Sequence, residues 1–207
     1  MRTSLYIGLI TAVISTAIGV LIGATAAVKG GLVDDILMSF TNIILTTPSI
    51  LVIILVASYL RVRSPEIVAI LLGLFSWPWF ARAVRAQLMS LVSREHVYLS
   101  KMSGYSDLRL AIEDLIPSMA TYVFMAFILF INGGILGEAA ISLLGLGPTS
   151  GVSLGLILQW AMLMESVRRN LWWWFIPPGI IIVALTSSLL IVVTTMDEVF
   201  NPRLRER

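Results

Sequence analysis

The sequence contains no cysteine and a single histidine, His96. It therefore offers no disulfide framework and no thiolate metal site, and one imidazole cannot build a metal centre alone. Charged residues make up 13% of the 207 positions, against about 25% in a typical soluble domain. The chain also lacks a nucleophile–base pair, a phosphate-cradling glycine loop and any metal-ligand spacing. We therefore expect neither a catalytic site nor a cofactor bound by this chain.

Hydrophobic residues, by contrast, occupy 58% of the positions, where a soluble domain has about 45–50%. A water-soluble core of this size cannot hold so much apolar surface, so the natural solvent of the chain is lipid. No soluble domain, long linker or internal repeat is visible, and residues 1–207 are expected to form one transmembrane domain. The sequence predicts an all-α polytopic membrane protein with about five helices, in contact with the lipid bilayer and not with nucleic acid.

Long uncharged runs place these helices, because about 20 apolar residues cross the hydrocarbon core. The predicted spans cover residues 3–28, 36–60, 67–91, 115–137 and 170–196. The third span is long enough only if it continues past Arg82 and Arg85, whose side chains would then reach the interface. Pro48 and Pro78 are expected kinks. The uncharged segment 139–164 is interrupted by several glycines, a pattern that favours an irregular or re-entrant element.

Basic residues indicate the orientation, because the positive-inside rule places them in the cytoplasm. They gather after the third span and at the end of the chain: Arg82, Arg85, Arg94, Lys101, Arg109, Arg203, Arg205 and Arg207. An even number of crossings must separate the two groups, and two crossings fit. Residues 147–172 then form an external loop or re-entrant helix, with Trp172 to Trp174 at the interface, and the N-terminus lies outside. Arg61 and Arg63 also fall outside, which counts mildly against this scheme.

A polar stretch at residues 93–117 separates the third and fourth spans and predicts two short helices. The first begins near Ser93 and ends before Gly104, a residue type suited to the left-handed turn that terminates a helix. The second, residues 106–115, carries one apolar stripe at positions i, i+3, i+4 and i+7: Leu108, Ala111, Ile112 and Leu115. Pro117 would open the next span, where its missing N–H costs nothing.

The amphipathic second helix of this loop has two interpretations. It can lie on the lipid surface, or it can insert into a groove of a partner protein with Leu108, Ile112 and Leu115 as anchors. Periodicity does not separate the two, because both require the same stripe. The acidic residues on the polar face, Glu113 and Asp114, argue slightly against anionic lipid.

The loop resembles the EAA loop of ABC importer permeases, and more narrowly that of the second permease subunit in the oligopeptide, dipeptide and nickel importer family. The resemblance begins with REHVYLSKMSGYSDLR at residues 94–109 and LIP at residues 115–117. Collinear matches extend along nearly the whole chain: RTSL at 2–5, GGLVD at 30–34, TTPS at 46–49, WPWFAR at 77–82, GEAAISLLGLG at 137–147 and NPRL at 201–204.

This resemblance implies that Gly104 marks a bend and that residues 106–115 form a coupling helix seated in a separate ATPase. The docking residues it implies are Gly104, Tyr105, Ser106, Asp107, Leu108, Arg109, Ile112, Leu115 and Pro117. Where the family has Glu-Ala-Ala, this chain has Tyr98, Leu99 and Ser100, so the glutamate contact does not transfer. Members of the family carry one more span ahead of the first one here, and we expect that helix to be missing from this chain.

The resemblance also implies a transport subunit, not an enzyme, of an ATP-driven, binding-protein-dependent importer in the prokaryotic plasma membrane. The implied partners are a second homologous permease subunit, two ATP-binding subunits that use ATP and Mg, and an external solute-binding protein. Peptides are the expected cargo, with oligosaccharides or a nickel chelate as alternatives. A remoter alternative is a channel or secondary transporter, which would not need the loop from Gly104 to Pro117. Another is a structural protein that assembles or anchors other subunits.

Polar side chains inside the apolar runs are candidates for the translocation path: Asn42, Thr46, Asn132 and Glu138. The alternative for Glu138 is a carboxyl group at a helix end, paired to a neighbour or hydrated from outside. Amide and hydroxyl groups can equally make hydrogen bonds between helices. Arg82 has the alternative of snorkelling to the cytoplasmic interface. Gly133 and Gly134 are expected to allow a close approach of helices.

Overall fold

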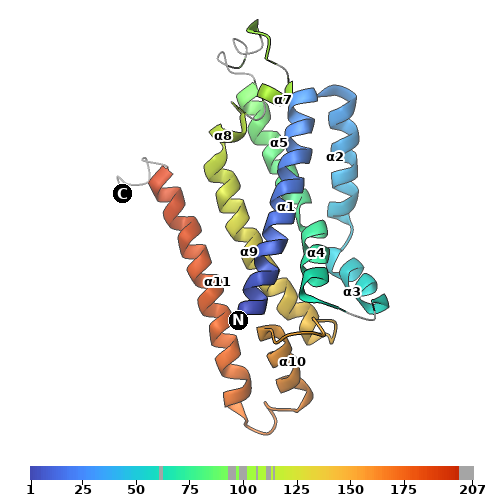
Figure 1. Cartoon of the computed structure of the whole chain (residues 1–207), viewed down its shortest axis with the longest axis vertical. Helices are drawn as coiled ribbons and strands as arrows, with labels where there is room; N and C mark the ends of the chain where they lie inside the picture. Colours follow the sequence, from blue (N-terminus) through green and yellow to red (C-terminus); the bar gives the residue numbers. More distant parts are fainter. Residues whose placement is uncertain are drawn as a thin grey trace.

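The computed structural model describes residues 1–60, 63–92, 97, 102–105, 107–110, 113 and 115–200. These residues form helices and turns, without a β-strand among them. The helices, drawn in Figure 1, are α1 Arg2–Lys29, α2 Gly31–Thr46, α3 Ser49–Tyr59, α4 Pro65–Ser76, α5 Pro78–Val92, α7 Asp107–Leu110, α8 Ile116–Ser118, α9 Ala120–Leu143, α10 Leu154–Leu163 and α11 Trp172–Phe200. The prediction of an all-α protein is confirmed.

Among the described residues, three helices are long and apolar enough to cross a membrane: α1, α9 and the Trp172–Met196 part of α11. Two bent pairs qualify when each pair is taken as one span, α2 with α3 at 77° and α4 with α5 at 45°. The bends fall at Pro48 and Pro78, because a proline lacks the N–H of the helical ladder and disfavours a helical residue before it. The prediction of about five spans is confirmed, although the second is broken far more sharply than a kinked helix.

Small residues line the buried side of α1, the helix around which α9, α5 and α4 pack. A Cβ atom built on Gly8 would lie 2.8 Å from the carbonyl oxygen of Ile131, and one on Gly23 would lie 2.5 Å from that of Ala81. The absence of side chains therefore lets the backbones of α9 and α5 reach α1 directly, as is usual for helices packed in lipid.

The glycine pair on α9 contributes to this packing through one member only. A Cβ on Gly134 would lie 2.8 Å from the Cα of Gly8, whereas one on Gly133 would meet nothing within 4 Å. The predicted close approach thus holds for Gly134, and Gly133 faces away from the bundle. Hydroxyl groups add hydrogen bonds between α1 and α4: Thr11 Oγ1 donates to the carbonyl of Ala69, and Ser15 Oγ donates to the carbonyl of Gly73.

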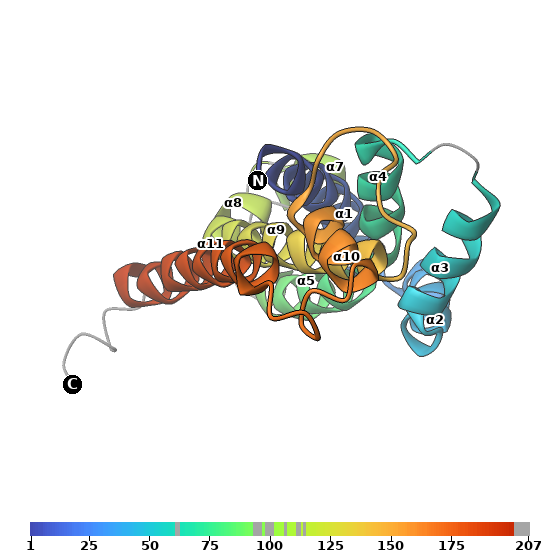
Figure 2. The ribbon, with the colours of Figure 1, turned by 90° about the horizontal axis from the view of Figure 1, so that it is seen from below.

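The two ends of the bundle carry different elements (Figure 1). The short helices α7 and α8 lie at the end where α1 and α5 finish, while α10 lies at the opposite end, toward the N-terminus. The view from below in Figure 2 places α11 on one side of the central helices and the α2–α3 pair on the other. The described part of the predicted 93–117 loop and the 147–172 segment are therefore at opposite ends, and the side of the membrane that each occupies stays a prediction.

Candidate functional site

Three of the docking candidates, Gly104, Tyr105 and Arg109, lie in α7 and the turn before it, at one end of the bundle. Gly104 has a φ of +83°, the left-handed conformation that a helix-terminating glycine adopts. Arg109 donates from Nε to Glu113 Oε2 at 2.8 Å, and its guanidinium carbon lies 4.1 Å from the centre of the Tyr105 ring. The hydrogen bond and the charge of Glu113 raise the pKa of Arg109 above its ordinary value. These contacts fix α7 against the turn that precedes it.

Leu115 does not present the exposed anchor that the apolar stripe predicts. Its side chain is fully buried, as is that of Leu110, and both pack in one core cluster with Leu88 of α5 and Met119 ahead of α9. The stripe position therefore faces the chain's own bundle, because the ends of α5 and α9 supply the apolar surface that a partner would otherwise provide. The leucine ties the loop to the transmembrane helices.

Several docking predictions fall outside the described residues. They concern Ser106 and Ile112, the side chains of Asp107 and Leu108, and most of the first predicted helix of the loop. Pro117 is exposed and lies in α8, one turn ahead of α9, so it precedes the span in a turn of its own.

Two hollows follow one another along α2. The first has a volume of about 260 Å³ and lies between α2 and α5, lined by Met38, Asn42, Arg82, Arg85 and Ala86. The second has about 290 Å³ and lies at the breaks of both bent pairs, lined by Ile44, Leu45, Thr47, Ser49, Phe75, Ser76, Pro78 and Trp79. Asn42, a predicted path residue, lines the first hollow. Thr46 is exposed beside the second and donates to the carbonyl of Ile43 at 3.0 Å.

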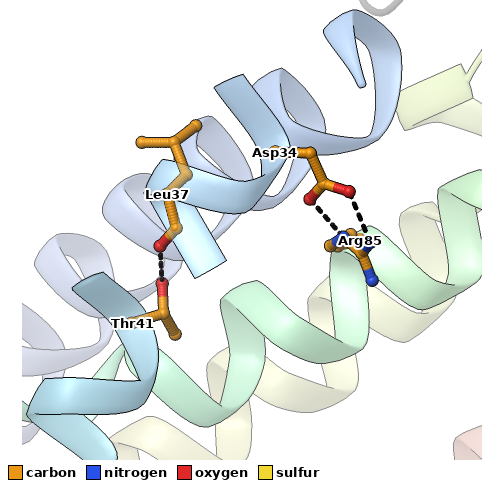
Figure 3. Close-up of polar contacts among 4 residues, drawn as sticks. All are labelled: Asp34, Leu37, Thr41 and Arg85. Atoms are coloured by element: carbon orange, nitrogen blue, oxygen red, sulfur yellow. Dashed lines mark hydrogen bonds and ion pairs between the residues drawn. The ribbon is translucent and has the colours of Figure 1, made fainter. Parts of the chain in front are cut away.

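An ion pair lies beside the first hollow, which Arg85 helps to line. Arg85 on α5 donates from Nε and Nη2 to the two carboxylate oxygens of Asp34 on α2 (Figure 3). Asp34 is almost completely buried in the first turn of α2, where the helix dipole favours a negative charge. A two-point guanidinium–carboxylate contact fixes both distance and orientation, so this pair sets how α2 sits on α5.

This ion pair was not predicted from the sequence. Asp34 lies within the matching string at residues 30–34, and Arg85 was expected to be one of the basic residues whose side chains reach the membrane interface. A usable signal existed, because both residues lie near the same end of consecutive spans, where a buried charge needs a partner of opposite sign.

Glu138, predicted for the path, instead forms the centre of a buried hydroxyl cluster. It is fully buried near the end of α9. Its Oε1 accepts from Ser142 and Ser153, each at 2.6 Å, and its Oε2 accepts from Ser4 at 3.3 Å. Neither hollow is lined by Glu138. The structure thus fits the alternative of a paired carboxyl group, with partners on three separate segments.

Two of these serines also connect Glu138 to the N-terminus of α10. Ser4 Oγ accepts from the backbone N–H of Leu154 at 3.1 Å, and Ser153 Oγ accepts from that of Leu156 at 3.0 Å. The first amides of a helix have no partner within it and carry a partial positive charge. The hydroxyls therefore relay this charge to Glu138, and the cluster joins α1, α9 and α10.

Asn132, the remaining path candidate, is buried on α9, and its Oδ1 accepts no hydrogen bond from the described residues. The four path candidates therefore divide between α2, which lines the hollows, and α9, which does not. Within the described part of the chain, no group of three or more His, Cys, Asp or Glu side chains could hold a metal ion.

The comparisons with known proteins agree with this architecture. The family model described as "Binding-protein-dependent transport system inner membrane component" matches residues 19–206. The oligopeptide transport system permease protein OppC of Lactococcus lactis subsp. cremoris is 31% identical over 173 residues, which are 83% of this chain and 58% of that protein. The dipeptide transport system permease protein DppC of Bacillus subtilis is 32% identical over 148 residues, 70% of this chain and 45% of that protein.

The chain therefore spans 58% of the length of that OppC relative and 45% of the DppC relative. A solved structure supports the fold: a chain from the inward-facing MetNI methionine ABC transporter has a TM-score of 0.68 at 16% identity, with 94% of this chain and 93% of that chain covered. The family match and the apolar helices identify a multi-pass protein of the prokaryotic plasma membrane. The resemblance drawn from the sequence is confirmed, and the chain belongs to the family of binding-protein-dependent transport system inner membrane components.

Proposed function

We propose that this chain is the permease subunit of an ATP-driven importer of short peptides. The observation that carries the proposal is its similarity, at 31–33% identity, to permeases named for oligopeptide and dipeptide transport. The chain would work with a second homologous permease, two ATP-binding subunits that use ATP and Mg, and an external solute-binding protein. It contributes no catalytic group of its own.

The turn around α7 is the proposed docking surface for an ATP-binding subunit. Gly104, Tyr105 and Arg109 lie at the free end of the bundle, next to the backbone of Asp107 and Leu108. The leucines beneath them pack into the same core as α1, α5 and α9. Because close-packed interiors transmit displacement, a push on this turn would move the ends of those helices and not the turn alone. Such a rigid connection is what ATP-driven alternating access requires.

The hollows beside α2 are the proposed part of the translocation path contributed by this chain. The first lies between α2 and α5 and is lined by the amide of Asn42, and the second lies where both bent pairs break, beside the hydroxyl of Thr46. The second permease would complete the wall. Glu138 stands apart from this path, and its cluster would hold α10 in place for the solute-binding protein, which we place at residues 147–172.

The test is reconstitution of the complete importer in liposomes, with tri-alanine as the cargo. Uptake should require ATP, the ATP-binding subunits and the solute-binding protein together, and the peptide-loaded binding protein should stimulate ATP hydrolysis. Failure of the chain to co-purify with an ATP-binding subunit would remove the proposal. Uptake that proceeds equally well without ATP would favour the channel or secondary transporter.

A further inference from the structure

Arg82 lies nearer the middle of the transmembrane helices than its place in the sequence indicates. The ring of Phe80, two residues earlier on α5, lies 5.6 Å from that of Phe130, close to the middle of the 24-residue helix α9. Two residues advance a helix by about 3 Å, and half of the hydrocarbon core is about 15 Å. With the middle of α9 placed at the centre of the bilayer, Arg82 is roughly 12 Å below the nearer membrane surface, beyond the reach of its side chain, so snorkelling alone does not account for it.

The side chain of Arg82 nevertheless has no counter-charge among the residues that the structure describes. It is exposed, and it makes no hydrogen bond or ion pair with any residue that the structure describes. A guanidinium at this depth is too costly to face lipid, so it must face water or a ligand. The first hollow offers that environment, since Arg82 is one of its lining residues.

The charges around this hollow do not cancel. Arg85 is held in a two-point contact by Asp34, which leaves that pair neutral. Asn42, one turn beyond Met38 on α2, adds an uncharged amide that can donate. The lining therefore carries one unbalanced positive charge from Arg82, beside a neutral donor on the facing helix. A guanidinium and an amide together match the two oxygens of a carboxylate.

We propose that the hollow between α2 and α5 is a carboxylate-binding subsite, in which Arg82 and Asn42 hold the free carboxylate of the cargo during its passage. This inference rests on the proposed function, because it assigns the cargo's carboxylate to a place in the peptide path. It makes the subsite selective for peptides that end in a free acid over those that end in an amide.

The experiment compares the uptake of tri-alanine and tri-alanine amide by the complete importer, with one solute-binding protein used throughout. Since the binding protein does not change, any change in the ratio of the two uptake rates arises in the permease. Arg82→Gln should lower the kcat/KM of the acid about tenfold or more, the effect of losing one charge-assisted hydrogen bond. Uptake of the amide should stay within about twofold of the wild-type rate. The control Lys29→Gln, which removes an exposed positive charge at the end of α1, should change the uptake of neither peptide.

A second variant leaves Arg82 in place. Asn42→Asp keeps the size of the side chain and supplies a carboxylate inside the hollow, which should compete with the acid and lower its uptake by a similar factor. An unchanged acid-to-amide ratio in Arg82→Gln and Asn42→Asp would overturn the subsite. An equal loss of both peptides would also overturn it, because Arg82 would then pair with an acidic residue of the second permease. A wild-type importer that moves neither peptide would instead refute the proposed function.

Discussion

Replacement of Glu138 tests whether its hydrogen bonds hold α10 to the bundle. Glu138→Ala removes an acceptor shared by Ser4, Ser142 and Ser153. Glu138→Gln keeps the size of the side chain and one oxygen acceptor, and its new N–H₂ group can donate to Ser4. The two variants therefore separate loss of hydrogen bonding from loss of the acidic group alone.

The magnitude follows from the three contacts. A hydrogen bond between membrane helices contributes about 0.6 kcal/mol on average and at most about 1.7 kcal/mol. Two of the three bonds join separate segments, and the bond from Ser142 lies within α9. With the same figure applied to all three, their loss gives about 2 kcal/mol, with an upper bound near 5 kcal/mol. The lower figure applies here, because Ser4 and Ser153 keep their bonds to the amides of Leu154 and Leu156. We expect Glu138→Ala to cost about 2 kcal/mol and Glu138→Gln less than about 1 kcal/mol.

A local assay is available because the chain contains no cysteine. Ala161 on α10 is 1% exposed, whereas its neighbour Met162 is 57% exposed. In the purified complex, Ala161→Cys should resist maleimide in the wild-type and Glu138→Gln backgrounds and should react in the Glu138→Ala background. Met162→Cys should react in all three backgrounds. Continued protection of the cysteine at position 161 in Glu138→Ala, with an unchanged unfolding midpoint, would refute the role of the cluster. An equal loss of stability and equal labelling in Glu138→Gln and Glu138→Ala would show that the acidic group itself is required.

Three further substitutions test the packing, the ion pair and the docking turn. Gly134→Ala should destabilise the protein by about 1–3 kcal/mol through overpacking against Gly8, while Gly133→Ala should leave the stability unchanged or raise it by up to about 1 kcal/mol. The two variants are compared by thermal unfolding in detergent, and equal unfolding midpoints would contradict the packing of Gly134 on Gly8. Asp34→Asn should lower the free energy of unfolding by about 1–3 kcal/mol. This is less than the loss from breaking a fully buried ion pair, because the Arg85 side chain is 30% exposed. In the same chemical denaturation assay, the control Asp35→Asn, at an exposed position, should change the free energy of unfolding by almost nothing. Gly104→Pro cannot keep a φ of +83°, so ATP hydrolysis should continue without uptake; normal uptake would exclude this turn from coupling.

The spans were predictable because their signal is local. The apolar runs that become α1, α9 and α11 are long, and length alone decides whether a helix can cross lipid. The side of each helix that is buried was less predictable, since a lipid-facing leucine and a core leucine have the same polarity. In α1 the informative residues are the glycines, which indicate where another backbone approaches. The sharp break at Pro48 also depends on packing that the residue type does not encode.

The site was predicted less completely, for a related reason. Glu138 stood out as an isolated acid, but its partners Ser4 and Ser153 are ordinary hydroxyl residues that become meaningful only when α1 and α10 meet α9. For Leu115 the type of face was predicted correctly, but the surface that covers it was not. Periodicity identified an apolar face correctly but could not tell which surface covers it, and the covering surface is the chain's own core.

The contacts also indicate which parts would move together. Backbone-close packing joins α1 to α5 and α9, the Glu138 cluster adds α10, and the buried Leu110 and Leu115 add the docking turn. The α2–α3 pair lies at the side of this unit, broken at Pro48 and held to α5 by the ion pair of Asp34 and Arg85. Since the hollows lie between the unit and this pair, we infer that a displacement of the docking turn changes the hollows by moving the unit against α2. A cargo carboxylate on Arg82 would then be bound or released by this movement, one helical turn from the ion pair that connects α2 to α5.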